Sequence, residues 1–288
     1  MSDENLAEIR NEKAKKIQHP KGKLTAYERL NLLLDEGSFS EIDQHVASDE
    51  NPEGEAVITG TGTIHGRPVF VFSEDFSVMG GSLGEVVAKK ILKIIDHALE
   101  ARAPIIGIKD SGGARIQEGI SSLFGYAQIF KKNVEASGKV PQISVVVGPS
   151  AGGAVYSPAL TDFIFQVKDI GQLYVTGPAV VKTVTGEDVT FEELGGVEAH
   201  GTKSGVTHQV CETEEQAFEE IRYLMSFLPQ SSSQKPPMFI TEDEPSRVIE
   251  SLDSFIPENR NQPYDMEKII LDIVDDGEHY PIQSNYAT

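Results

Sequence analysis

The sequence predicts an α/β fold built on a largely parallel sheet, with a helical arm before it and an acidic extension after it. Two apolar runs, 104–108 and 142–147, are typical of strands buried on both faces. A glycine-rich turn and a helical pattern follow each run. This order implies a right-handed crossover, so the two strands are expected to be parallel neighbours. We expect the arm at 1–24, one compact domain at 25–229, and a linker with the acidic extension at 230–288.

Composition limits the classes of function. The 288 residues include 45 Asp and Glu against 25 Lys and Arg, a formal net charge of −20. Nucleic acids and anionic membranes require a cationic face, so neither is an expected partner. Without a secretion signal or a long apolar run, the chain is expected to be cytoplasmic. Its single cysteine, Cys211, and the absence of metal-ligand spacing among seven histidines lead us to expect no disulfide and no metal.

Helical patterns recur along the chain. Residues 25–28 (TAYE) and 82–85 (SLGE) match the capping box, in which the first and fourth residues cap each other's backbone. They are expected to begin the second and third helices, and Gly37 offers a stop for the second. The predicted helices span 4–18, 25–37, 82–102, 118–136, 214–228 and 266–275.

Strand patterns fill most of the remaining sequence up to the linker. The dipeptide His65-Gly66 between two of them predicts a hairpin. The predicted strands span 39–42, 56–64, 68–72, 104–108, 142–147, 163–167, 173–176 and 206–210. The stretch 229–237 (PQSSSQKPP) is typical of a linker. Beyond it, residues 241–288 carry twelve acidic side chains and three basic ones.

The chemistry is expected in two glycine turns, at 111–115 and 149–154. Both turns should lie at the carboxyl edge of the sheet, where open α/β sheets bind ligands. Paired glycines adopt dihedrals that a Cβ forbids, and they leave N–H groups pointing outward. Two adjacent turns can each give one N–H to a single oxygen, which makes an oxyanion hole. The alternatives are that these glycines serve only strand–helix packing or cradle a phosphate.

A third glycine segment, 79–82 (MGGS), precedes the predicted third helix. Its glycines could let a loop close over a ligand, and the first N–H groups of the helix could meet phosphate. The alternative is a plain turn between loop and helix. The segment is not a Walker loop, because it lacks Gly-Lys-Ser/Thr. Arg115 is expected either to pair with an anionic group of the substrate or to form a structural ion pair.

Ser150 supports a different class of enzyme. Residues 148–152 match the G-x-S-x-G nucleophile elbow in a predicted strand–turn–helix setting. His200, His208 or His279, with an aspartate, could complete a catalytic triad in the right chain order. The pattern is short, however, and the adjoining glycines suit a backbone oxyanion hole equally well. A serine hydrolase with Ser150 as nucleophile therefore stays an alternative.

Several long motifs together identify a family. They closely resemble the carboxyltransferase (β) subunit of biotin-dependent acyl-CoA carboxylases, the propionyl-CoA carboxylase type in particular. The matching segments are KGKLTAYERL at 21–30, MGGSLG at 79–84, DSGGARIQEG at 110–119 and GPSAGGAVYSPALTD at 148–162, with Gly195-Gly196 and His200 also fitting. They occur in the family's order, and the resemblance spans about residues 4–288.

The resemblance implies a crotonase-type fold (ClpP/crotonase superfamily) of stacked ββα units, with an acyl-CoA bound against the glycine turns. It implies transfer of a carboxylate from carboxybiotin to the α-carbon of a short acyl-CoA, such as propionyl-CoA or acetyl-CoA, through an enolate. The implied backbone oxyanion hole comprises Gly113, Ala114, Gly152 and Gly153. The implied substrate-binding residues are Val78, Met79, Gly80, Gly81, Arg115 and Ser150.

The resemblance also implies partners. Biotin is expected on a biotin carboxylase or biotin carrier subunit and not on this chain, and a homo-oligomer is expected. Family members carry a second crotonase-like domain, so we expect a C-terminal carboxyltransferase half that this sequence does not contain. Two further possibilities stay open: an acyl-CoA decarboxylase subunit of the same family, and a non-enzymatic assembly subunit.

Overall fold

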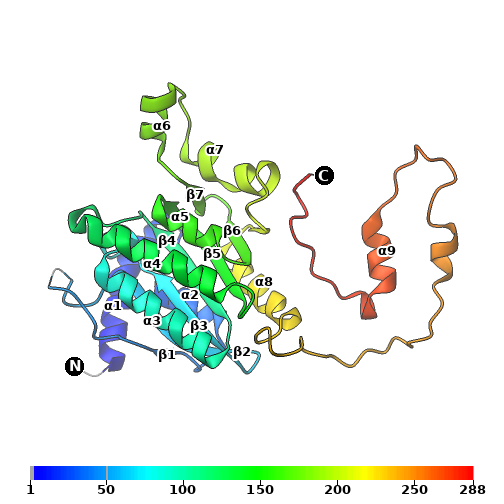
Figure 1. Cartoon of the computed structure of the whole chain (residues 1–288), viewed down its shortest axis with the longest axis horizontal. Coiled ribbons are helices and arrows are strands. Elements are labelled where there is room, and N and C mark those ends of the chain that lie inside the picture. Colours follow the sequence, from blue (N-terminus) through cyan, green and yellow to red (C-terminus); the bar gives the residue numbers. More distant parts are fainter. Residues whose placement is uncertain (1–2, 50, 288) are drawn as a thin grey trace. The chain divides into compact units, whose positions relative to one another are not determined.

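A computed structural model describes residues 3–49 and 51–287 of the chain (Figure 1). The chain forms two compact units: Met1–Pro236 together with Gln283–Thr288, and Pro237–Ile282. In the first unit the chain end is attached by a hydrogen bond from the Gln283 N–H to the His208 carbonyl oxygen, at 2.8 Å. The arm expected at 1–24 lies in the same compact unit as the sheet. The expected domain boundaries at residues 24 and 229 stay predictions. None of the described helices is both long enough and apolar enough to span a bilayer.

An eight-stranded sheet organises the first unit. The strands follow the order β1-β2-β3-β4-β5-β6-β8, and β7 pairs with β5. Pairing is antiparallel from β1 to β3 and parallel from β3 onward. The strands are β1 (Ser40–Glu41), β2 (Val57–Ile64), β3 (Arg67–Glu74), β4 (Ile105–Ser111), β5 (Gln142–Ala151), β6 (Phe163–Val167), β7 (Gln172–Tyr174) and β8 (Gln209–Cys211). The expected parallel neighbours, β4 and β5, are confirmed.

The predicted hairpin is confirmed between β2 and β3. Its two turn residues, His65 and Gly66, have φ values of 53° and 71°. A two-residue turn with positive φ at both positions matches the right-handed twist of the strands that it joins. β3 in turn pairs in parallel with β4, so the chain that leaves β3 toward the third glycine segment starts beside β4.

Helices cover the sheet. Figure 1 shows α3 and α4 side by side, and their apolar faces share one buried core with β2, β3 and β4. Helices α2 and α8 contact each other, and they also contact β3 and β6 respectively. The α-helices of this unit are α1 (Asp3–Gln18), α2 (Ala26–Leu33), α3 (Glu85–Ala101), α4 (Ile120–Ala136), α5 (Gly153–Ala159), α6 (Pro178–Thr185), α7 (Phe191–Gly195) and α8 (Glu214–Phe227). The second unit contains α9 (Met266–Ile273).

Helix boundaries depart from the predictions in three places. The capping box of α2 is present, but the helix ends at Leu33, before Gly37. The capping box expected at the start of α3 is wrong, because Gly84 is the N-cap residue and supplies no side-chain hydrogen bond. Residues before it are extended, and Leu83 pairs with Ala114 in a parallel bridge. The helix expected at 118–136 is divided, because Gly119 has a φ of 55° between a 3-10 turn and α4.

Candidate active site

The segment around Met79–Gly81 lies against the first glycine turn. The Gly112 N–H donates to the Gly80 carbonyl oxygen, and the Leu83 N–H donates to that of Gly113, both at 2.9 Å. The Arg115 N–H donates to the Leu83 carbonyl oxygen at 2.9 Å as well. Gly81 is required here because a Cβ would lie 2.1 Å from the Asp110 carbonyl oxygen. Backbone hydrogen bonds therefore join the third glycine segment, 79–82, to the first glycine turn, 111–115.

The second glycine turn adjoins the first. Ser111 at the end of β4 is the register partner of Ser150 near the end of β5. Gly113 has a φ of 99°, and a Cβ at this position would lie 2.7 Å from the Ala151 carbonyl oxygen. Gly152, with a φ of 56°, is the N-cap residue of α5. The expectation that both turns meet at the carboxyl edge of the sheet is thus confirmed.

The four predicted oxyanion-hole amides fall into two classes. The Gly113 N–H donates to Ser111 Oγ, and the Gly152 N–H donates to the Tyr174 carbonyl oxygen, both at 3.1 Å. For the part of the chain that is described, the N–H groups of Ala114 and Gly153 have no hydrogen-bond acceptor. One unengaged N–H thus remains in each turn, next to a glycine whose own N–H is engaged, by Ser111 of the same turn for Gly113 and by Tyr174 of β7 for Gly152.

The predicted substrate loop borders a cavity of about 300 Å³. Met79, which is 39% exposed and has a φ of 47°, lines this cavity beside Val78. Two cationic side chains from α1, Arg10 and Lys13, line the same cavity. Gly80 adopts a φ of 64°, a conformation that favours glycine. The predicted residues Val78 to Gly81 therefore form one turn at the border of this cavity.

Arg115 is engaged by carboxylates of the chain itself. Its guanidinium, which is 1% exposed, pairs with Glu55 at 2.9 Å and with Glu118 at 2.8 Å. Burial opposes its charge, but the hydrogen bonds to Glu55 and Glu118 outweigh burial and raise its pKa. This is the structural ion pair that the sequence left open as an alternative to a substrate contact.

The first N–H of α3 is also occupied. Glu118 Oε2 accepts a hydrogen bond from the Glu85 N–H at 2.6 Å. A carboxylate at a helix N-terminus satisfies an unpaired donor and is favoured by the helix dipole. A phosphate at this N–H, one of the two possibilities that the sequence left open, would therefore meet a carboxylate already in place.

Ser150 does not have the geometry of a nucleophile. It lies within β5 and not on a turn, it is fully buried, and it pairs with Leu173 of β7. Among the described residues, none donates a hydrogen bond to Ser150 Oγ or accepts one from it. The ring nitrogens of His200 contact Ser204 and the Leu173 carbonyl oxygen, and His208 Nδ1 accepts from the Ile164 N–H. The nucleophile elbow is thus a wrong interpretation of this segment.

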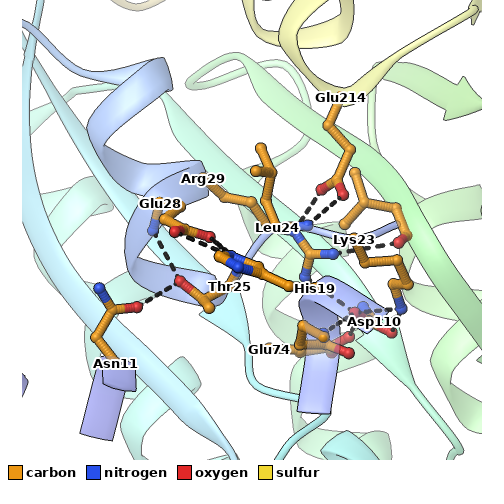
Figure 2. Close-up of polar contacts among 12 residues, drawn as sticks. Asn11, His19, Lys23, Leu24, Thr25, Glu28, Arg29, Glu74, Asp110 and Glu214 are labelled. Atoms are coloured by element: carbon orange, nitrogen blue, oxygen red, sulfur yellow. Dashed lines mark hydrogen bonds and ion pairs between the residues drawn. The ribbon is translucent and has the colours of Figure 1, made fainter. Parts of the chain in front are cut away.

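A buried cluster of charges lies directly behind the first turn, and the sequence did not predict it (Figure 2). Asp110, the residue before Ser111, is fully buried and pairs with Lys23 Nζ at 2.6 Å and with Arg29 Nη1 at 2.9 Å. Arg29 Nε in turn pairs with Glu214 at 2.5 Å. We call this cluster the Asp110 network; it comprises Lys23, Arg29, Glu74, Lys109, Asp110 and Glu214.

The backbone of Asp110 is held as firmly as its carboxylate. Glu74 Oε2 accepts the Asp110 N–H at 2.9 Å, and Lys109 Nζ lies 3.3 Å from Glu74 Oε1. Burial raises the pKa of Glu74 and Glu214, against the opposing effects of Lys109 and Arg29 respectively. Burial likewise lowers the pKa of Lys23, although Asp110 opposes the shift. Three acids and three bases make the network neutral in its formal charges.

Two signals in the sequence could have revealed this network. Lys109-Asp110 directly follows the apolar run of β4, so that two charges continue a buried strand. Arg29 sits among leucines on the apolar face of α2. Charged residues at such positions are rarely fully buried unless they are paired. Among the described residues, including this network, no group of three or more His, Cys, Asp or Glu side chains could hold a metal ion.

Comparisons with known proteins place these features in a family. Residues 17–288 match the model of the carboxyl transferase domain. The propionyl-CoA carboxylase beta chain of Roseobacter denitrificans is 54% identical over 94% of this chain and 54% of its own length. The methylmalonyl-CoA decarboxylase subunit alpha of Veillonella parvula is 52% identical over 99% of this chain and 58% of its own length. The chain therefore spans about half the length of the curated relatives that it matches.

Solved structures agree with the sequence comparisons. A crystal structure of transcarboxylase 12S with methylmalonyl-coenzyme A bound superposes with a TM-score of 0.93 at 43% identity. The match covers 99% of this chain and 58% of that one. The beta subunit of P. aeruginosa geranyl-CoA carboxylase gives a TM-score of 0.68 at 27% identity, over 96% of this chain and 52% of that one. The predicted crotonase-type α/β fold is confirmed, and the chain belongs to the carboxyl transferase domain family.

Proposed function

We propose that this chain binds a short acyl-CoA and stabilises its enolate during transfer of a carboxylate to the α-carbon. The observation that carries the proposal is the pair of unengaged N–H groups, Ala114 and Gly153, in two adjacent turns. The thioester oxygen of the acyl-CoA accepts from both. When the α-proton leaves, negative charge develops on that oxygen, and each donor in place stabilises it by about 2.7–4 kcal/mol.

The relatives support propionyl-CoA as the acyl-CoA and biotin as the carboxyl carrier. Curated relatives at 51–55% identity are named propionyl-CoA carboxylase beta chains, and the transcarboxylase 12S structure holds methylmalonyl-coenzyme A. Biotin, carried by a biotin carboxylase or biotin carrier subunit, would supply the activated carboxylate. This chain's part is to bind and orient the acyl-CoA, with Val78 to Gly81 beside the CoA portion.

A decarboxylase function is the second candidate, because one relative at 52% identity is a methylmalonyl-CoA decarboxylase subunit. Loss of carboxylate from methylmalonyl-CoA gives the same enolate, so the same two N–H groups would serve both directions. Incubation with methylmalonyl-CoA and free biotin, followed by analysis of propionyl-CoA and carboxybiotin, distinguishes carboxyl transfer from decarboxylation. Carboxybiotin formed with propionyl-CoA indicates transfer, whereas propionyl-CoA formed without carboxybiotin indicates decarboxylation.

The test of the proposed site removes one donor without removing a side chain. Ala114→Pro deletes the N–H, and Ala114→Ser is the matched control that keeps it. Binding is measured by calorimetry for propionyl-CoA and for a CoA thioether ending in a nitronate, whose oxygen is anionic like that of an enolate. Because a transition-state mimic exploits the hole more than a substrate does, the unaltered chain should prefer the nitronate by about 100-fold.

Ala114→Pro should abolish this preference of about 100-fold, while its affinity for propionyl-CoA changes little. Ala114→Ser should keep the preference. If the unaltered chain binds neither ligand at millimolar concentration, the proposal of an acyl-CoA site fails. Equal losses for both ligands in Ala114→Pro would instead assign Ala114 to general binding and not to the oxyanion.

We also infer a homo-oligomer, since the transcarboxylase 12S structure is that of a hexamer assembly. Sedimentation velocity across a hundredfold range of protein concentration tests this inference. A single species with the mass of one chain throughout that range would contradict it.

A further inference from the structure

We infer that Gln18 and Lys23, at the end of α1 and just beyond it, are positioning residues for the oxyanion turn through the carboxylate of Asp110. Both side chains reach the start of that turn from the N-terminal segment of the chain. Gln18 Nε2 donates to Asp110 Oδ2 at 3.1 Å, and Lys23 Nζ donates to Asp110 Oδ1 at 2.6 Å. As a statement about catalysis, the inference rests on the proposed function.

The carboxylate and the N–H of Asp110 are fixed by hydrogen bonds, and its carbonyl oxygen is closely packed. Its carboxylate accepts from Gln18, Lys23 and Arg29, and its N–H donates to Glu74. Its carbonyl oxygen lies in contact with the backbone of Gly81, where even a methyl group would not fit. A residue held at its carboxylate and its N–H gives a fixed starting point to the turn that follows it.

The backbone of the first turn links Asp110 to the unengaged N–H of Ala114. Ser111 follows directly, and its Oγ accepts the Gly113 N–H at 3.1 Å. That bond and the φ of 99° at Gly113 set the direction of the next peptide, which carries the Ala114 N–H. Three peptide units therefore separate the peptide of the unengaged donor from Asp110, which bears the buried carboxylate. Oxyanion holes depend on such precise placement, since a displacement of 1 Å can cost about 100-fold in rate.

Stability alone does not account for the buried charges of the network. Lys23, Arg29, Asp110 and Glu214 are each at most 8% exposed. Removing such charges from water costs several kcal/mol per ion, and buried ion pairs often contribute no more than apolar residues of the same volume. If these four residues served only to stabilise the fold, leucines at their positions would do so equally well. What a network of directed hydrogen bonds adds is a defined geometry at the residue where the turn begins.

The space beside the Asp110 carboxylate leaves no room for a side chain on the neighbouring strand. At Gly148 of β5, a Cβ would lie 1.9 Å from Asp110 Oδ1 and 2.6 Å from Lys23 Nζ. The segment that bears the second turn thus packs directly against the contact between Lys23 and Asp110. Gln18 and Lys23 thereby bear on the geometry of both turns.

The test compares two neighbouring lysines. Lys23→Met removes the ammonium from Asp110 but keeps the length of the side chain. Lys21→Met is the matched control, because Lys21 Nζ lies over the same Phe76 ring, at 4.9 Å against 5.0 Å for Lys23, and has no contact with Asp110. Gln18→Met is the second test variant and leaves all charges in place. Circular dichroism and the melting temperature show that each variant is folded.

Two measurements are made on each folded variant. Amide NMR shifts of Gly113 and Ala114 report the turn without any ligand, and calorimetry reports the preference for the nitronate over propionyl-CoA. In Lys23→Met and Gln18→Met, both amide shifts should move and the preference should fall at least about tenfold. Affinity for propionyl-CoA should change much less. Lys21→Met should match the unaltered chain in both measurements.

The outcomes distinguish this inference from the proposed function. Unchanged amide shifts and preference in folded Lys23→Met and Gln18→Met overturn the inference, even if the unaltered chain prefers the nitronate. The same changes in Lys21→Met overturn it as well, because they would be a general effect of charge. If the amide shifts move but the unaltered chain shows no preference, the proposed function fails while the positioning of the turn is upheld.

Discussion

A single buried ammonium, that of Lys90, illustrates how the fold controls ionisation. This residue of α3 is 1% exposed, and its Nζ donates to the Val57 carbonyl oxygen at 3.1 Å. Burial, assisted by the positive charge of Arg10, lowers the pKa of Lys90 to about 8. In the unfolded chain the ordinary value of 10.5 applies. Between these two pH values the unfolded chain binds more protons than the folded chain, so folding becomes more favourable as the pH rises.

Lys90→Met removes this dependence and provides the measurement. Below pH 8, Lys90 is protonated in both the folded and the unfolded chain, and the folded chain bears the full free-energy cost of the buried charge. Relative to Lys90→Met, the unaltered chain should therefore gain about 2 kcal/mol in free energy of unfolding from pH 7 to pH 10. Urea unfolding of both proteins at pH 7, 8, 9 and 10 tests this. A constant difference between them would contradict the assigned burial of the ammonium.

At the scale of elements, the start of α3 depends on a residue from another segment. Glu118, in the 3-10 turn before α4, accepts from the first N–H of α3 and pairs with Arg115. It thereby joins the two helices that cover the core beside the glycine turns. Cap and ion pair are lost together when this carboxylate is removed.

Glu118→Ala should lower the free energy of unfolding by about 1–2 kcal/mol, because the N–H of Glu85 loses its acceptor and Arg115 loses one carboxylate. Gln117→Ala is the control, since Gln117 is exposed in the same turn. Chemical denaturation at pH 7 provides the comparison. Equal stabilities for the two variants would show that water replaces the cap without cost.

Local patterns account for most elements that the sequence predicted. The periodicity of α3, α4 and α8 and the apolar runs of β4 and β5 depend only on nearby residues, and the helical spacing of apolar residues survives in the fold. The start of α3 could not be predicted in this way, because its cap comes from 33 positions further along the chain. Helices α6 and α7 were missed although Pro178 and the capping box at Thr190 begin them.

The candidate site was predictable to a similar extent. Glycine spacing and strand order were sufficient to place the two turns side by side. Which amides remain unengaged depends on the Ser111 hydroxyl and on the Tyr174 carbonyl oxygen, and Tyr174 lies in a strand beyond α5. The Asp110 network joins positions up to 185 residues apart: Arg29 pairs with Asp110, 81 positions away, and with Glu214, 185 positions away. Periodicity carries no information about such pairs.

At the scale of the whole molecule, the two units differ in how much of their surface is protected. The first unit contains the sheet and its apolar core. The second begins with residues 237–249, which form no helix or strand, and Met238, Phe239 and Ile240 are 88%, 74% and 101% exposed. An exposed segment without regular structure can enter the active site of a protease while the rest of the protein stays folded.

Limited chymotrypsin digestion should therefore cut first after Phe239. Phe165 and Phe218 of the first unit are each 1% exposed and should resist until the protein unfolds. Mass spectrometry of early time points identifies the cleavage sites. First cuts within the first unit would contradict this difference in protection between the units.

The long reach of the Asp110 network has a consequence for biosynthesis. Arg29 and Glu214 are 185 positions apart, and ribosomes add about 5–20 residues per second. The guanidinium therefore waits about 10–40 s after its own synthesis before its second carboxylate exists. During translation the first helices cannot reach their final charge pairing, whatever their own helical tendency. The Asp110 network is therefore completed only when Glu214 has been made, well after the glycines of the first turn.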